Sequence, residues 1–225
     1  MRSLIRDVLE FALPQRCPGC GAGAEPERLL CDACVARIPR FAGALCVRCL
    51  AAGREPAACR AHPGFAARAA WLYDERAARF VHALKYEERP GLARAAGREM
   101  ARTLPPGYRP DLIAEVPLHR VRLRERGYNQ AACLADAVAE ALAAPRHPRA
   151  LARVRPTRTQ ANLGPAERRA NLAGAFRLER PGEWAGRSVL IVDDVLTTGA
   201  TLEACLAPLR AAGADASGLA LAWAQ

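Results

Sequence analysis

The chain has 225 residues, of which 51% are hydrophobic and 25% are charged, a composition that is ordinary for a folded protein and excludes a disordered chain. The formal net charge of +10 would suit a nucleic-acid-binding protein, but arginine is used throughout and Lys85 is the single lysine, which is a feature of composition before it is one of function. Between Arg109 and Arg180 there are 14 arginines against 7 acidic residues, so the positive charge lies mainly in the middle of the chain.

The first sixteen residues, MRSLIRDVLEFALPQR, predict a short amphipathic helix. They do not resemble a signal peptide, because Asp7 and Glu10 interrupt the apolar residues. No later stretch has the length of a membrane span. We therefore expect a cytoplasmic protein without membrane insertion, in a reducing compartment where paired cysteines bind metal more often than they form disulfides.

Four pairs of metal-binding residue types follow, each with a gap of two residues. They are Cys17 and Cys20, Cys31 and Cys34, Cys46 and Cys49, and Cys59 and His62. Because two such pairs can complete one tetrahedral site, the pattern predicts two structural zinc sites in a region with few large apolar residues of its own. The spacing leaves open consecutive or interleaved pairing, a single site with surplus cysteines, and disulfides.

The composition changes after Pro63 and Gly64, and we expect a domain boundary near residue 65, between an N-terminal helix with a zinc module (1–65) and a second domain (66–225). Apolar periodicity predicts two amphipathic helices, and short apolar runs predict three strands. The helices fall at 92–104 and 134–142, and the strands at 112–116, 188–192 and 219–223. This alternation predicts an α/β fold with a mostly parallel sheet, whose ligands bind beyond the carboxyl ends of the strands.

The run VLIVDDVLTTGAT at 189–201 combines a strand, two carboxylates, a turn of small residues and the start of a helix near Thr201. Backbone N–H groups in such a turn, together with the helix dipole, can bind a phosphate dianion. Asp193 and Asp194 can accept hydrogen bonds from vicinal hydroxyls or bind Mg²⁺. The run therefore predicts a site for a ribose 5-phosphate, and the alternative is an acidic strand end followed by a threonine-rich helix cap.

All thirteen positions of this run resemble the signature with which type I phosphoribosyltransferases bind 5-phosphoribosyl 1-pyrophosphate (PRPP). The resemblance implies that fold, PRPP with Mg²⁺ as ligand, and Asp193 and Asp194 as catalytic contacts to the ribose hydroxyls. It implies a binding segment made of Val192, Asp193, Asp194, Thr197, Thr198, Gly199, Ala200 and Thr201. It also implies a pyrophosphate loop at 116–120, with Arg120 as the contact.

The segment RGYNQ at 126–130 and later arginine-rich motifs, behind cysteine pairs, resemble the ComF family of competence-associated phosphoribosyltransferase-like proteins, which usually have a cysteine in place of His62. We expect residues 153–171 to form a loop that closes over the diphosphate, with a solvated basic surface as the alternative. Its candidate contacts are Arg153, Arg155, Thr157, Gln160 and Arg168. Lys85 is expected at the surface, although the family often has a lysine there.

The resemblance implies displacement of pyrophosphate from ribose C1 by a nitrogen acceptor, for instance a nucleobase held by a variable hood. The candidate hood is the zinc module with residues 71–85. The alternative is a catalytically silent accessory protein of natural transformation, which senses PRPP or handles single-stranded DNA and whose partners are DNA or other competence proteins. A purely structural zinc adaptor would leave the thirteen-residue run unexplained.

Overall fold

The computed structural model describes residues 17, 20–23, 30–53, 59–86, 90–155 and 164–225. The expected N-terminal helix lies outside these ranges, as do Thr157 and Gln160. Within them, no helix is both long enough and apolar enough to cross a lipid bilayer.

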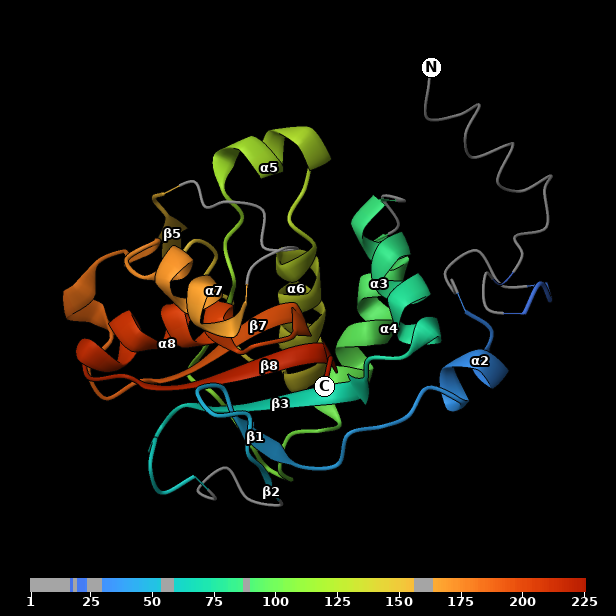
Figure 1. Ribbon diagram of the computed structural model, residues 1–225, viewed down its shortest axis with the longest axis horizontal. Coiled ribbons are helices and arrows are strands. Elements are labelled where there is room, and N and C mark those ends of the chain that lie inside the picture. The colour runs from blue at the N-terminus through green and yellow to red at the C-terminus, as the bar shows by residue number, and fades with distance from the viewer. Residues whose placement is uncertain (1–16, 18–19, 24–29, 54–58, 87–89, 156–163) are drawn as a thin grey trace.

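A six-stranded sheet with the order β2-β1-β3-β8-β7-β4 forms the centre of the molecule (Figure 1). The strands are β1 (Ala44–Cys46), β2 (Ala52–Gly53), β3 (Ala66–Leu72), β4 (Leu112–Glu115), β7 (Ser188–Leu196) and β8 (Asp215–Trp223). The strands β3, β8, β7 and β4 run parallel, whereas β1 and β2 pair antiparallel at one edge. A separate antiparallel pair joins β5 (Leu151–Arg153) to β6 (Phe176–Leu178). The expected α/β fold with a mostly parallel sheet is confirmed.

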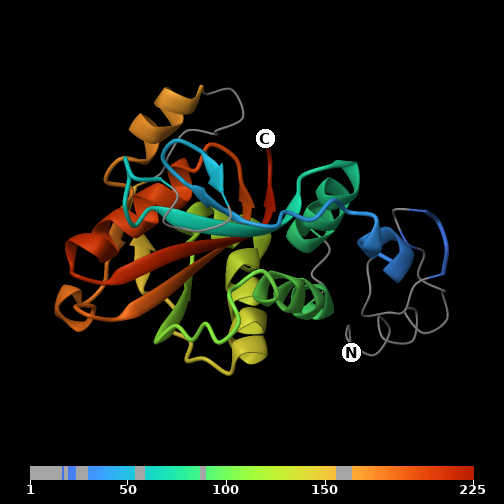
Figure 2. The same cartoon turned by 90° about the horizontal axis from the view of Figure 1, so that it is seen from below.

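Helices cover both faces of the sheet, α3, α4 and α6 on one side and α8 on the other (Figures 1 and 2). The helices are α2 (Asp32–Ala36), α3 (Glu75–Tyr86), α4 (Pro90–Ala101), α5 (Arg120–Arg126), α6 (Gln130–Leu142), α7 (Pro165–Leu172) and α8 (Ala200–Ala211). Side chains of β7 alternate between the two cores. Leu190 and Val192 pack with α4 and α6, while Val189 and Ile191 pack with α8.

The cysteine-rich region contributes to both cores. Cys34 and Ile38 are buried in the core that contains α3 and α4, whereas Leu45 and Val47 are buried in the core that contains α8. The strand β1 also joins the main sheet, because Leu45 pairs with Ala67. Residues before and after position 65 therefore share one sheet.

The expectation of a loop throughout 153–171 is wrong at its end, where α7 forms. Gly164 precedes the helix, Pro165 occupies its first turn, and the Glu167 carboxylate accepts a hydrogen bond from the Gly164 N–H at 2.8 Å. Such capping satisfies an N–H group that would otherwise lack a partner at the helix start. The segment has little apolar periodicity, which is why the pattern of the sequence alone predicted a loop.

Candidate functional site

Two carboxylates lie near the carboxyl end of β7 and are almost fully buried. Asp193 and Asp194 are 8% and 6% exposed. Since successive side chains of a strand point to opposite faces, Asp193 faces α8, where Cys205 is its neighbour, and Asp194 faces α3 and α6. The two carboxylates therefore have separate surroundings, although they are adjacent in the sequence.

Asp194 is held by two donors from helices on its face of the sheet. Its Oδ2 lies 2.9 Å from Lys85 Nζ and accepts a hydrogen bond from Gln130 Nε2, also at 2.9 Å. Burial lowers the pKa of Lys85, but the charge and the hydrogen bond of Asp194 outweigh it and leave that pKa above its ordinary value. The lysine therefore stays charged in this environment.

The expectation that Lys85 lies at the surface is wrong. The side chain is 25% exposed and extends from the last turn of α3 to the buried carboxylate. Its partner is on a strand far along the chain, so local periodicity gave no sign of the contact. Two signals were usable: Lys85 is the single lysine in a chain that otherwise uses arginine, and the family that the chain resembles often has a lysine at this position.

Asp193 has a different electrostatic environment. Burial raises the pKa of its carboxyl to about 8, and the adjacent charge of Asp194 acts in the same direction. The hydrogen bond that the Asp194 N–H donates to this carboxyl opposes the rise in pKa, as do the charges of Lys85 and Arg153. At neutral pH the Asp193 carboxyl therefore favours its protonated form until a further cation approaches.

The turn after β7 leads directly into α8. Gly199 has φ +75° and precedes the first helical residue, Ala200, and its carbonyl accepts a hydrogen bond from the Glu203 N–H at 2.8 Å. A Cβ at Gly199 would lie 1.9 Å from the carbonyl oxygen of Val47. Glycine is thus required here both by the backbone conformation and by the close approach of another segment.

The expected arginine contacts differ in how the structure places them. Arg168 Nη1 lies 3.5 Å from Thr197 Oγ1, and Arg153 is half-buried close enough to Asp193 to interact with its charge. Arg155 instead donates to the backbone carbonyls of Asn171 and Ala173, each at 2.9 Å. Arg120 is exposed at the start of α5, which stands away from the sheet (Figure 1).

The segment 126–130 contributes more to the site than the sequence indicated. Buried Gln130 accepts a hydrogen bond from Arg126 while it donates to Asp194. Asn129 caps α6 and donates to the Val116 carbonyl at 3.1 Å, which ties the loop after β4 to the same region. The resemblance to the ComF family pointed to these residues without assigning them a role.

The eight zinc-binding candidates form two clusters, within each of which the ligand atoms lie less than 4.8 Å apart. The first cluster is Cys17, Cys20, Cys31 and Cys34, and the second is Cys46, Cys49, Cys59 and His62. Consecutive pairs therefore join. All nine cysteines fall within the described residues and are free thiols, so the disulfide alternative is not realised.

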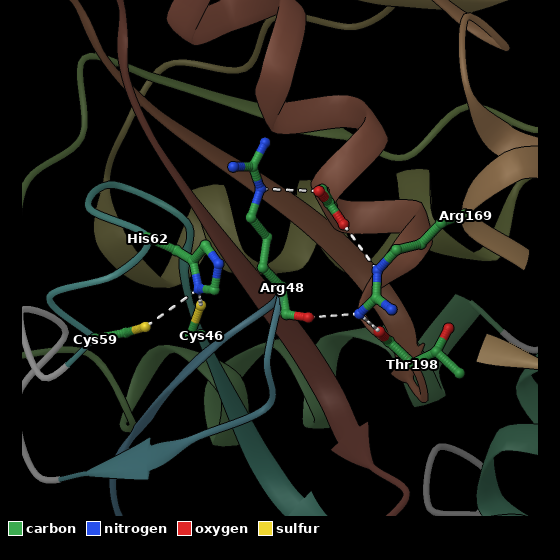
Figure 3. A network of polar contacts seen from close by, with 7 residues as sticks. Cys46, Arg48, Cys59, His62, Arg169 and Thr198 are labelled. Atoms are coloured by element: carbon green, nitrogen blue, oxygen red, sulfur yellow. Dashed lines mark hydrogen bonds and ion pairs between the residues drawn. The ribbon is translucent and has the colours of Figure 1, made fainter. Parts of the chain in front are cut away.

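The spacing of the ligand atoms fits zinc. His62 Nδ1 lies 3.4 Å from Cys59 Sγ and 3.7 Å from Cys46 Sγ (Figure 3). Ligands around a tetrahedral zinc ion are separated by roughly 3.5 Å. Burial, with the neighbouring thiols, raises the pKa of Cys34 to about 12, so a thiolate at that position requires a nearby cation.

Comparison with known families agrees with this geometry. Residues 8–62 match the family model of the double zinc ribbon domain, which spans the ligands of both clusters. Residues 129–225 match the family model of the phosphoribosyl transferase domain, which includes β7, the turn after it and α8. No curated protein matches the chain.

Proposed function

We propose that this chain, which combines a double zinc ribbon domain with a phosphoribosyl transferase domain, binds PRPP with Mg²⁺ and transfers its phosphoribosyl group to a nitrogen acceptor, releasing pyrophosphate. The observation that carries this proposal is the sequence of elements at 189–201. A buried strand brings two carboxylates to its carboxyl end, and a glycine turn then leads into a twelve-residue helix. This is the edge at which parallel α/β sheets bind ligands.

The ribose 5-phosphate would bind in the turn from Thr197 to Thr201. Backbone N–H groups at the start of α8 are not used within the helix and can donate to an anion, and the helix dipole favours negative charge there. Arg168 adds a guanidinium beside Thr197. We infer that this turn holds the substrate in place while the reaction occurs at the other side of the ribose.

The ribose hydroxyls would lie against Asp193 and Asp194. Lys85 and Gln130 fix one oxygen of Asp194, which leaves its orientation defined before the substrate arrives. Mg²⁺ bound to the diphosphate would neutralise part of the charge on the leaving group. Arg153 and Arg120 are the proposed guanidinium contacts to that diphosphate, and such fixed cations stabilise charge that develops in the transition state.

The acceptor would enter on the side of the candidate hood, between the zinc ribbon and α3. We propose a nucleobase nitrogen as the nucleophile, in a cytoplasmic enzyme whose nine cysteines remain reduced. Since the reaction needs no covalent enzyme intermediate, the protein would act by positioning the reactants and excluding water.

One observation favours a second candidate function, that of a catalytically silent PRPP sensor or single-stranded-DNA-handling protein of natural transformation. Helix α5 carries alternating arginines on an exposed segment, where Val121 and Leu123 are 51% and 41% exposed. Exposed arginines can neutralise the phosphates of a nucleic-acid strand. A salt-sensitive affinity for single-stranded DNA without pyrophosphate release would favour this function over transfer.

A thermal-shift titration of the zinc-loaded protein with PRPP and Mg²⁺ tests the proposal. Ligand at a hundred times its dissociation constant adds about 2.7 kcal/mol, which moves the midpoint by several degrees. The Asp193→Asn/Asp194→Asn double variant should show little shift. A wild-type protein that does not respond to PRPP would overturn the proposal, whereas a response justifies screening nucleobases for pyrophosphate release.

A further inference from the structure

One pair of zinc ligands lies directly against the turn from Thr197 to Thr201, which we call the phosphate turn. Val47, between Cys46 and Cys49, is fully buried, and its carbonyl oxygen is the atom that a Cβ at Gly199 would meet at 1.9 Å. The Val47 N–H donates to the Phe65 carbonyl at 2.8 Å, which fixes the segment from its other side. The contact therefore joins the backbone of the second zinc cluster to the backbone of the turn.

An ion-pair bridge reinforces this contact (Figure 3). The Glu203 carboxylate, in the first turn of α8, accepts from Arg48 Nε at 2.8 Å through one oxygen and from Arg169 Nε at 3.2 Å through the other. Arg48 belongs to the zinc-binding segment and Arg169 to α7. One carboxylate thus links three segments that lie far apart in the chain.

Arg169 also bonds to the backbone on both sides of the contact. Its Nη2 donates to the Arg48 carbonyl at 2.5 Å and to the Thr198 carbonyl at 3.3 Å (Figure 3). Because a peptide unit is planar and trans, a fixed Thr198 carbonyl directs the Gly199 N–H to the opposite side. The guanidinium therefore orients a donor of the phosphate turn without touching the ligand position itself.

The first cluster has different neighbours. Cys17 and Cys34 are buried in the core formed with α3 and α4, on the opposite face of the sheet from α8. The ion pair of Arg48 with Glu203 joins α8 to the segment of the second cluster and not to that of the first. The two clusters have the same two-residue gap within each ligand pair, but they contact different parts of the fold.

We infer that the second zinc cluster positions the phosphate turn through the Val47 contact and the Arg48–Glu203–Arg169 bridge. The three bridge residues are positioning residues, and release of metal from this cluster alone loosens Thr197 to Thr201. The effect on PRPP affinity rests on the proposed function. The effect on the turn does not, since it follows from contacts present without ligand.

A matched pair of cysteine variants in the full chain tests this inference. Cys49→Ser and Cys20→Ser each remove an exposed ligand, the second cysteine of its pair, from one cluster. Zinc content is measured for both, followed by hydrogen exchange of the 197–201 amides and the dissociation constant for Mg-PRPP. Cys49→Ser should speed exchange in the turn and weaken PRPP binding about tenfold, a change of about 1.4 kcal/mol. Cys20→Ser should leave both quantities near their wild-type values, and equal exchange in the two variants overturns the inference.

Variants that keep both zinc clusters intact cover the case in which Cys49→Ser fails to fold. Arg169→Lys keeps the charge but loses the fork that reaches two carbonyls and a carboxylate. It should therefore speed exchange in the turn as Arg169→Ala does, with Glu203→Gln intermediate. The matched control, Glu179→Gln, removes a carboxylate that pairs with Arg177 away from the turn and should have no effect. Full rescue by lysine would show that charge alone matters and would overturn the bridge.

The two proposals fail in different ways. If wild-type protein does not bind PRPP, the proposed function fails, while hydrogen exchange in the turn still reports the coupling. If PRPP binds but Cys49→Ser and the Arg169 variants leave exchange and affinity unchanged, the coupling fails and the proposed function stands.

Discussion

The two faces of the central sheet treat neighbouring residues of the same strand differently. On one face, Asp194 is paired with Lys85 near the core that contains the first zinc cluster. On the other, Asp193 is buried opposite α8, whose first turn is bridged to the second cluster. Adjacent residues of one strand therefore have different roles. On one face a carboxylate is held in a fixed ion pair, whereas the other face supports the backbone turn that follows the strand.

Removal of both zinc ions should have the largest effect. Chelation leaves the clustered thiols without a cation. Because the zinc ribbon has little apolar core of its own, the free energy of metal binding supplies most of the free energy with which it folds. We expect the protection of β1 amides to be lost before the amides of β7 exchange. Simultaneous loss of β1 and β7 protection would contradict this order of unfolding.

Gly199→Ala should break the contact between the second cluster and the turn. The new Cβ would meet the Val47 carbonyl at 1.9 Å in a residue with φ +75°. Gly186→Ala is the matched control, because Gly186 has φ +74° with nothing within 4 Å of the added Cβ. Conformational strain should lower the free energy of unfolding of each variant by about 1–2 kcal/mol, as measured with denaturant. The clash with Val47 should lower that of the Gly199 variant by about the same amount again. Equal losses would show that the segment between Cys46 and Cys49 moves aside freely.

Lys85→Met should lower the free energy of unfolding by about 2 kcal/mol, because it leaves the buried carboxylate of Asp194 without its cation. Asp194→Asn in the same chain should recover part of this loss. A double-mutant cycle of unfolding free energies measures the pairing directly. Additive losses in the two single variants would contradict a coupled pair.

The pH dependence of the unfolding free energy should distinguish the two carboxylates. Since the pKa of Asp193 is raised to about 8 from an ordinary value of 3.8, the folded protein keeps a proton that the unfolded chain has released between these values. The contribution of Asp193 to stability is therefore greatest below about pH 4 and is lost as the pH rises through 8. Urea midpoints from pH 6 to 9 should fall more for the wild type than for Asp193→Asn. Parallel curves would mean that the carboxyl is already ionised at pH 6.

Local signals explain what the sequence predicted. The strand 188–192, its two aspartates and the helix near Thr201 lie within one continuous run, so residue order was enough to place them. The strand proved longer, ending at Leu196, because pairing with β8 continues to Trp223. The end of a strand depends on the strands that pair with it, and the pattern within one segment contains no information about those partners.

Contacts between distant segments explain what the sequence did not predict. Spacing alone left the pairing of the zinc ligands open, and the structure joins consecutive pairs. The Arg48–Glu203–Arg169 bridge, like the pair of Lys85 with Asp194, depends on how distant elements pack. An arginine in an arginine-rich chain gives no local sign of such a role.

The edge of the sheet next to the second cluster has a consequence for association between chains. The seven-residue strand β3 is covered on its outer side by the three-residue β1, which is followed by the two-residue β2. Short outer strands of this kind deny a neighbouring chain a long row of unpaired backbone groups. Because Cys46 is both the last residue of β1 and a ligand of the second cluster, we expect zinc depletion to uncover β3 and to promote edge-to-edge aggregation.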